Sequence, residues 1–157
     1  MKTYLNLMID SLEKKLAVLE QIQAASVRQA QLIKAEPFDQ EKFDNAMDEK
    51  AKQIDQLNQL DDGFDSLYSR VRENLSLQKE SYLDEIAKLQ KLIRLISEKS
   101  AAIQVAEQRN RTALEKVCAR ENERLRTIQN KSNLMKNYAR NMSQVNYIDP
   151  QFMDWKK

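Results

Sequence analysis

Few side chains of this protein are suited to catalysis or to holding a metal. The 157 residues include no histidine and one cysteine, Cys118. Without an imidazole there is no histidine general base, no partner to activate the thiol and no histidine metal ligand. The adjacent carboxylates Asp61 and Asp62 remain, but such pairs far more often form a solvated helix face or a helix cap. We therefore expect no enzymatic activity, no metal and no cofactor.

The scarcity of helix-breaking residues points to long helices. The chain has one glycine and two prolines, which excludes glycine-rich phosphate loops and dinucleotide fingerprints. Charged residues make up 32%, hydrophobic residues 41%, and the mean hydropathy is −0.73. Apolar residues recur at spacings of three and four, and few positions can interrupt a helix. This composition predicts a thin helical bundle or coiled coil whose function depends on its helical surfaces.

The sequence also predicts a cytoplasmic protein. Asp10 and Glu13 interrupt the apolar N-terminal residues before the core of a signal peptide could form. No apolar run approaches the roughly 18 residues that span a bilayer, so we expect no membrane insertion. A lone cysteine cannot form an intramolecular disulfide.

A first helix is expected over residues 3–35. Its apolar stripe advances by four, three, four and three residues, through Leu5, Ile9, Leu12, Leu16 and Leu19. This spacing is typical of an amphipathic helix. Pro37 ends it, because the residue before a proline is disfavoured in the helical conformation.

A second helix is expected over residues 39–75. Asp39 is a suitable N-cap, and Phe38 and Phe43 have the spacing of a hydrophobic staple. Gly63 interrupts the stripe. The heptad phase is the same on both sides of this glycine, which favours a continuous helix; a C-cap that divides the segment is the alternative.

A third helix is expected over residues 81–142, with Ser81 and Asp84 as a capping box. It would be roughly 90 Å long, well beyond the other two. The fold class is therefore all-α: an antiparallel three-helix bundle or coiled coil with an overlong third helix. One helical domain, 1–145, precedes a non-helical C-terminal tail, 146–157.

The second half of the third helix has a narrow apolar seam. Glu107, Asn110 and Glu121 occupy seam positions there, which leaves room for a single partner helix. We expect partner contacts on the apolar seam residues Leu114, Val117, Leu125, Ile128, Met135, Tyr138 and Met142. The tail carries the aromatic residues Tyr147, Phe152 and Trp155, which either cover the bundle or form a recognition segment.

Charge is distributed unevenly along the chain. Residues 36–65 hold ten acids and three bases, a net charge of −7, whereas residues 109–140 hold nine bases and three acids, a net of +6. Antiparallel packing would bring the two blocks together at one end of the bundle. The alternative is that the basic block binds nucleic acid or a membrane surface, but regularly spaced glutamates and few aromatics weaken this interpretation. We therefore expect no nucleic-acid partner.

Two stretches resemble a known family. Residues 45–75, NAMDEKAKQIDQLNQLDDGFDSLYSRVRENL, and residues 147–157, YIDPQFMDWKK, resemble the second helix and the tail of FlgN-type flagellar export chaperones from Gram-positive bacteria. The resemblance implies a cytoplasmic chaperone for flagellar hook–filament junction proteins. It would shield their terminal helix from premature assembly and deliver them to the flagellar type III export apparatus. In that family the C-terminal part of the chaperone grips the substrate.

Two questions stay open at this level. Chaperones of similar build serve the filament cap protein, so the substrate is not determined. A structural coiled-coil protein that self-associates through the third helix as a homodimer is the alternative function, which sedimentation at two concentrations would distinguish.

Overall fold

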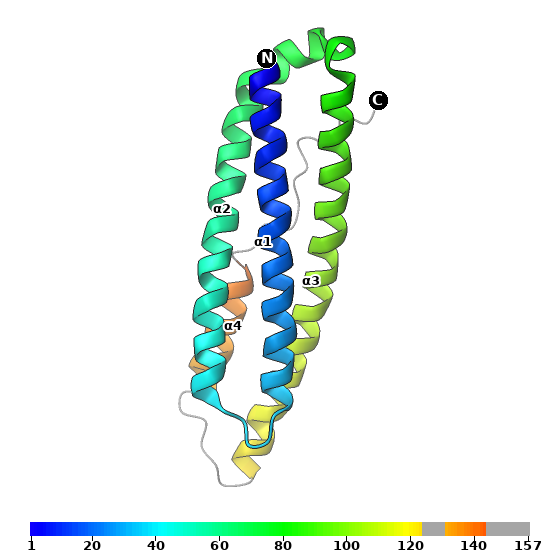
Figure 1. The fold of residues 1–157 in the computed structure, drawn as a ribbon. Coiled ribbons are helices and arrows are strands. Elements are labelled where there is room, and N and C mark those ends of the chain that lie inside the picture. Colours follow the sequence, from blue (N-terminus) through cyan, green and yellow to red (C-terminus); the bar gives the residue numbers. More distant parts are fainter. Residues whose placement is uncertain (124–130, 144–157) are drawn as a thin grey trace.

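The computed structural model describes residues 1–123 and 131–143, and every element in this part of the chain is helical (Figure 1). The expected all-α class is confirmed. The elements are four α-helices and one short 3₁₀ helix: α1 (Lys2–Lys34), α2 (Gln40–Leu77), η1 (Lys79–Tyr82), α3 (Leu83–Glu123) and α4 (Lys131–Ser143).

Helix α1 lies between α2 and α3 and packs along both (Figure 1). Helix α2 runs antiparallel to α1, and α3 returns in the direction of α1. Lys2 Nζ lies 3.9 Å from a carboxylate oxygen of Glu85, and Lys99 Nζ donates to Gln23 Oε1 over 3.1 Å. These contacts match the start of α1 with the start of α3 and its middle with the middle of α3.

The beginning and continuity of α2 follow the sequence. The carboxylate of Asp39 accepts a hydrogen bond of 3.1 Å from the backbone amide of Lys42, so this residue is the N-cap. The Phe38 and Phe43 rings lie 5.7 Å apart, as a hydrophobic staple requires. The helix passes through Gly63, whose φ is not positive. The predicted continuity at this glycine is confirmed.

Side chains of α1, α2 and α3 form one buried cluster, here called the proximal core. The same helices also bury an ion pair, Lys15 of α1 and Asp61 of α2, whose charged atoms lie 2.6 Å apart. Burial of the many leucines and isoleucines of the proximal core supplies most of the stabilisation of these three helices. Its fully buried members are Leu5, Met8, Leu19, Ile22, Ile54, Leu57, Leu75, Leu89 and Ile103.

The prediction of one overlong third helix is wrong. Helix α3 ends at Glu123, and α4 lies back against α3 and α2 (Figure 1). Tyr138 of α4 hydrogen-bonds Glu107, 31 residues earlier; in a continuous helix these residues would be roughly 46 Å apart. The return buries apolar side chains of α4 that a protruding helix would expose to water.

One further predicted boundary is wrong, and another falls on residues that the structure does not describe. Ser81, the expected cap of the third helix, lies inside η1, and α3 begins at Leu83. The predicted tail, 146–157, lies outside the described residues.

The expected meeting of the acidic and basic blocks is found: Arg120 Nη1 lies 3.0 Å from Glu36 Oε1. This pair is partly solvated and contributes about 0–1 kcal/mol.

Candidate functional site

The described residues of the predicted partner-binding set gather at one end of the molecule. Leu114 and Val117 lie on α3, and Met135, Tyr138 and Met142 lie on α4. The other members lie outside the described residues: Leu125, Ile128, Tyr147, Phe152 and Trp155.

The two α3 residues belong to a second buried cluster, here called the distal core. All four α-helices contribute to it. Leu114 is 0% exposed, and Tyr138 of α4 covers the cluster at 2% exposure. The seam expected to be open to a partner is therefore filled by the chain's own α4. The members of the distal core are Ile33, Phe43, Met47, Leu114, Val117, Cys118, Leu134 and Tyr138.

One face of α4 accounts for this packing. Leu134 and Tyr138 are buried, and Met142, four residues further on, is half-buried. A spacing of four places the three side chains on the same side of the helix. Lys136 and Arg140 are exposed on the opposite side. Helix α4 is thus a short amphipathic helix seated between α2 and α3.

A buried carboxylate links all four helices beneath α4. Glu107 of α3 is 5% exposed. One of its oxygens accepts from the Lys50 ammonium of α2 and the Ser26 hydroxyl of α1, and the other accepts from the Tyr138 hydroxyl of α4. A buried charge needs such partners, because removing a carboxylate from water is otherwise very unfavourable.

Further hydrogen bonds complete this polar cluster. Lys50 Nζ donates to Gln29 Oε1 over 3.0 Å, and Asn110 Nδ2 donates to the backbone oxygen of Ser26 over 3.0 Å. The Lys50 ammonium lies 5.5 Å from the centroid of the Tyr138 ring. Burial lowers the pKa of Lys50, and the charge of Glu107 and its hydrogen bond oppose that shift. The cluster therefore fixes the alignment of the four helices at one level of the bundle.

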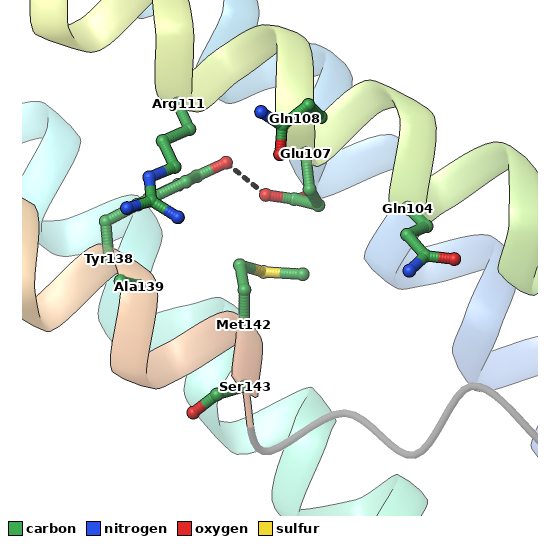
Figure 2. A pocket seen from close by; sticks show the side chains of 8 residues that line it. All are labelled: Gln104, Glu107, Gln108, Arg111, Tyr138, Ala139, Met142 and Ser143. Carbon is green, nitrogen blue, oxygen red and sulfur yellow. Dashed lines mark hydrogen bonds between the residues drawn. The ribbon is translucent and has the colours of Figure 1, made fainter.

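A groove runs between α3 and α4 beside this cluster. Its volume is about 250 Å³, and its walls include Gln104, Arg111 and Met142. Figure 2 shows Tyr138 pointing from α4 across the groove to Glu107, with the Met142 side chain alongside. The groove thus leads from the surface to the buried carboxylate.

Two more grooves separate α4 from α2, with volumes of about 400 and 380 Å³. Asp44 and Asp48 line the α2 wall, and Asn137 of α4 faces both grooves. Burial raises the pKa of Asp44, and the neighbouring charge of Asp48 raises it further. This wall is acidic, whereas α4 carries three basic residues and no acid.

Sequence reasoning missed several residues of this site. Leu134 was not selected, although it lies four residues before Tyr138. Glu107 and Asn110 were recognised as polar residues on seam positions, but their burial was not expected. Lys50 carried the same signal, because it lies three residues after Met47 and four before Ile54 on the apolar stripe. Polar residues at seam positions could therefore have identified the cluster.

The described residues contain neither a cluster of metal-ligand side chains nor a helix that could span a membrane. Among residues 1–123 and 131–143, no group of three or more cysteine, aspartate or glutamate side chains could hold a metal ion. Over the same residues, no helix is both long enough and apolar enough to cross a bilayer. The distal end consists of helices packed around the buried Lys50–Glu107 ion pair.

Comparison with known proteins identifies the family. The sequence model of the family described as FlgN protein matches residues 1–145, which includes both cores and all four α-helices. No curated protein and no solved structure gives a match. The family match covers most of the 157 residues. The chain therefore belongs to the FlgN family of flagellar export chaperones.

Proposed function

We propose that this protein binds an amphipathic terminal helix of the flagellar hook–filament junction proteins in the cytoplasm. It keeps that helix from assembling prematurely and aids delivery of the junction protein to the flagellar type III export apparatus. Family membership supports the chaperone role. The likeness of residues 147–157 to the Gram-positive subgroup remains a prediction.

The distal end is the proposed site of contact. The observation that carries this proposal is the seating of an amphipathic helix, α4, against α2 and α3 at this end. A surface that packs one amphipathic helix has the apolar floor and the length that a substrate helix requires. The half-buried methionines Met135 and Met142 are flexible side chains that adapt to different partners. The described contact residues are Leu114, Val117, Met135, Tyr138 and Met142, and the proposal extends to Leu125, Ile128, Tyr147, Phe152 and Trp155.

The proposal is tested by purifying the tagged full chain from its own source and identifying bound proteins by mass spectrometry. We expect a junction protein at a near one-to-one ratio. A photo-crosslinking residue at the exposed Gln108, beside the α3–α4 groove, should capture it. The matched control is the same residue at Lys91, exposed on the proximal part of α3. Equal capture at both positions, or a filament cap protein in place of the junction protein, would contradict the proposal.

The alternative of self-association through the third helix predicts a dimer at twice the monomer mass of 18.4 kDa. In the described structure, α4 already covers the apolar seam that this dimer would use. Sedimentation at two concentrations tests this alternative, because a monomer at both concentrations would eliminate it.

A further inference from the structure

Helix α4 depends on the groove in which it lies. It has 13 residues, and isolated helices of this length are marginal in water. Its helical form therefore owes much to the packing of Leu134 and Tyr138 against α2 and α3. The space between α2 and α3, here called the α2–α3 groove, acts as a receptor for a short amphipathic helix.

The described contacts between α4 and the other helices are limited. Among its described side chains, residues 133–143, Leu134 and Tyr138 are buried, and open grooves flank the helix on both sides. Solvent therefore reaches both edges of α4, and its contact with α2 and α3 is confined to one face. Among the described residues, the hydrogen bonds that join α4 to the other helices include that of the Tyr138 hydroxyl to Glu107 and one of 3.1 Å from Asn141 Nδ2 to the backbone oxygen of Met47.

The walls of the groove do not depend on α4 in the same way. The buried members of the proximal core come from α1, α2 and α3, and the half-buried Met142 of α4 packs against them. From the side of α1, Ser26 holds Glu107 and Gln29 holds Lys50. Removal of α4 would leave the Lys50–Glu107 pair intact but expose the apolar side chains of the distal core to water. Another helix must then cover them.

We propose that the partner helix enters the α2–α3 groove in exchange for α4 and imitates its contacts. This inference rests on the proposed function and specifies the partner. The partner helix carries a large apolar residue and, four residues later, a tyrosine whose hydroxyl reaches Glu107. Basic or amide side chains face Asp44 and Asp48, because α4 presents Asn133, Asn137 and Arg140 on that side.

If the partner helix replaces α4, one substitution in α4 should raise the affinity for the partner rather than lower it. Helix α4 competes with the partner from within the same chain. The apparent affinity for the partner is therefore the intrinsic affinity multiplied by the fraction of molecules in which α4 has left the groove. Tyr138→Phe removes one hydrogen bond from α4 and should therefore tighten partner binding, by about tenfold. If the partner instead rests on α4, the same change leaves binding unchanged or weakens it.

Two labelled peptides serve as probes of the full-length chain. One is residues 131–143 of this protein, and the other is the terminal helix of the junction protein. Fluorescence anisotropy with Tyr138→Phe should show tighter binding of both than wild type, and each should displace the other. Asn141→Ala should act in the same direction with a smaller effect. Tyr4→Phe, on an exposed tyrosine of α1, is the matched control and should change neither.

Amide hydrogen exchange provides a second test, because it reports directly on whether α4 stays in place. When the junction helix binds, backbone amides of α4 should exchange faster with solvent, while those of α3 near Glu107 stay protected. Slower exchange of α4 would show that the partner docks onto α4 and would overturn the inference. A peptide of residues 131–143 that binds neither wild type nor Tyr138→Phe would overturn it as well.

The two proposals fail in different ways. If the 131–143 peptide binds and the junction helix does not, the groove is a helix receptor but the junction protein is not its partner, so the proposed function fails. If the junction helix binds without competition from the 131–143 peptide, the proposed function stands and the exchange fails. A 131–143 peptide with tyrosine replaced by phenylalanine should bind more weakly than the unaltered peptide, and equal binding would contradict the role of Glu107.

Discussion

The two ends of the bundle are built differently. The proximal core joins three helices through an almost continuous set of leucine and isoleucine side chains. The distal core is smaller, draws on four helices and lies beside a buried polar cluster centred on Glu107. Apolar packing favours any arrangement that excludes water, whereas a buried charge requires specific partners. The proximal end therefore supplies stability, and in the proposed exchange the distal end would specify which helix it accepts.

Each end also contains a buried ion pair, and the pairs differ in their surroundings. Lys15 and Asp61 join two helices, α1 and α2. Lys50 and Glu107 are surrounded by hydrogen-bond partners from α1 and α4. A pair with several partners is more sensitive to the loss of one member, because each of the remaining groups loses a contact.

The largest effect is expected from Glu107→Leu. The substitution leaves the Lys50 ammonium buried without its counter-charge, which should lower the free energy of unfolding by about 3–5 kcal/mol. Urea denaturation followed by circular dichroism measures the change. The matched control is Glu98→Leu, an exposed glutamate of the same helix, which should change stability little.

A double variant tests the cause of that loss. Lys50→Met combined with Glu107→Leu removes both charges and should recover much of the stability lost by Glu107→Leu alone, because apolar residues often replace a buried ion pair without loss. If the double variant is as unstable as the single one, the loss comes from packing rather than from the uncompensated charge.

Leucine-to-alanine substitutions at the two ends should affect different processes, global unfolding at the proximal end and local opening of α4 at the distal end. Leu89→Ala, in the proximal core at 0% exposure, should lower the free energy of global unfolding by about 2–5 kcal/mol. Leu134→Ala, in α4, should lower it less and instead accelerate hydrogen exchange within α4, because local opening of α4 leaves the proximal core intact. Equal losses of global stability at both sites would show that α4 and the bundle unfold as one unit.

Much of the proximal end could be predicted from the sequence. The apolar period, the Asp39 cap and the constant phase across Gly63 are local signals, and they determine α1 and α2 almost completely. The course of the chain after α3 has no such signal. A heptad seam that continues through residues 114–142 is equally compatible with a protruding helix and with one that folds back. Tertiary burial of Leu134 and Tyr138 decides between them.

The candidate site shows the same division. The apolar members Leu114, Val117 and Tyr138 could be selected from spacing alone. Their packing against α4 was not expected, because a seam that looks unfilled in one helix can be filled by a segment distant in sequence. The polar cluster required pairing Glu107 with Lys50, 57 residues apart, and helical period carries no information about such pairing.

A smaller effect, of opposite sign, is expected at Gly63. The residue is exposed within α2 in the proximal half, and a Cβ atom added there meets no atom within 4 Å. Gly63→Ala should therefore raise the free energy of unfolding by about 0.5–1 kcal/mol, since glycine loses more backbone entropy in a helix than alanine. Gln59→Ala, at an exposed position of the same helix, is the control and should give a smaller gain. A loss of stability for Gly63→Ala would indicate that α2 bends at the glycine.

The smallest effect is a pH dependence at the proximal ion pair. Burial raises the pKa of Asp61 above 3.8, and the opposing attraction of Lys15 does not cancel this. The folded state then holds a proton on Asp61 more tightly than the unfolded state does. The stability gained in this way is fully present below pH 3.8 and is lost as pH rises through the folded pKa. Wild type should therefore gain stability relative to Asp61→Asn as pH falls from neutral towards 3.8, measured by urea unfolding at each pH. If wild type instead loses stability relative to Asp61→Asn, then Lys15 outweighs burial, and the proximal pair resembles the distal one more closely than its two-helix setting indicates.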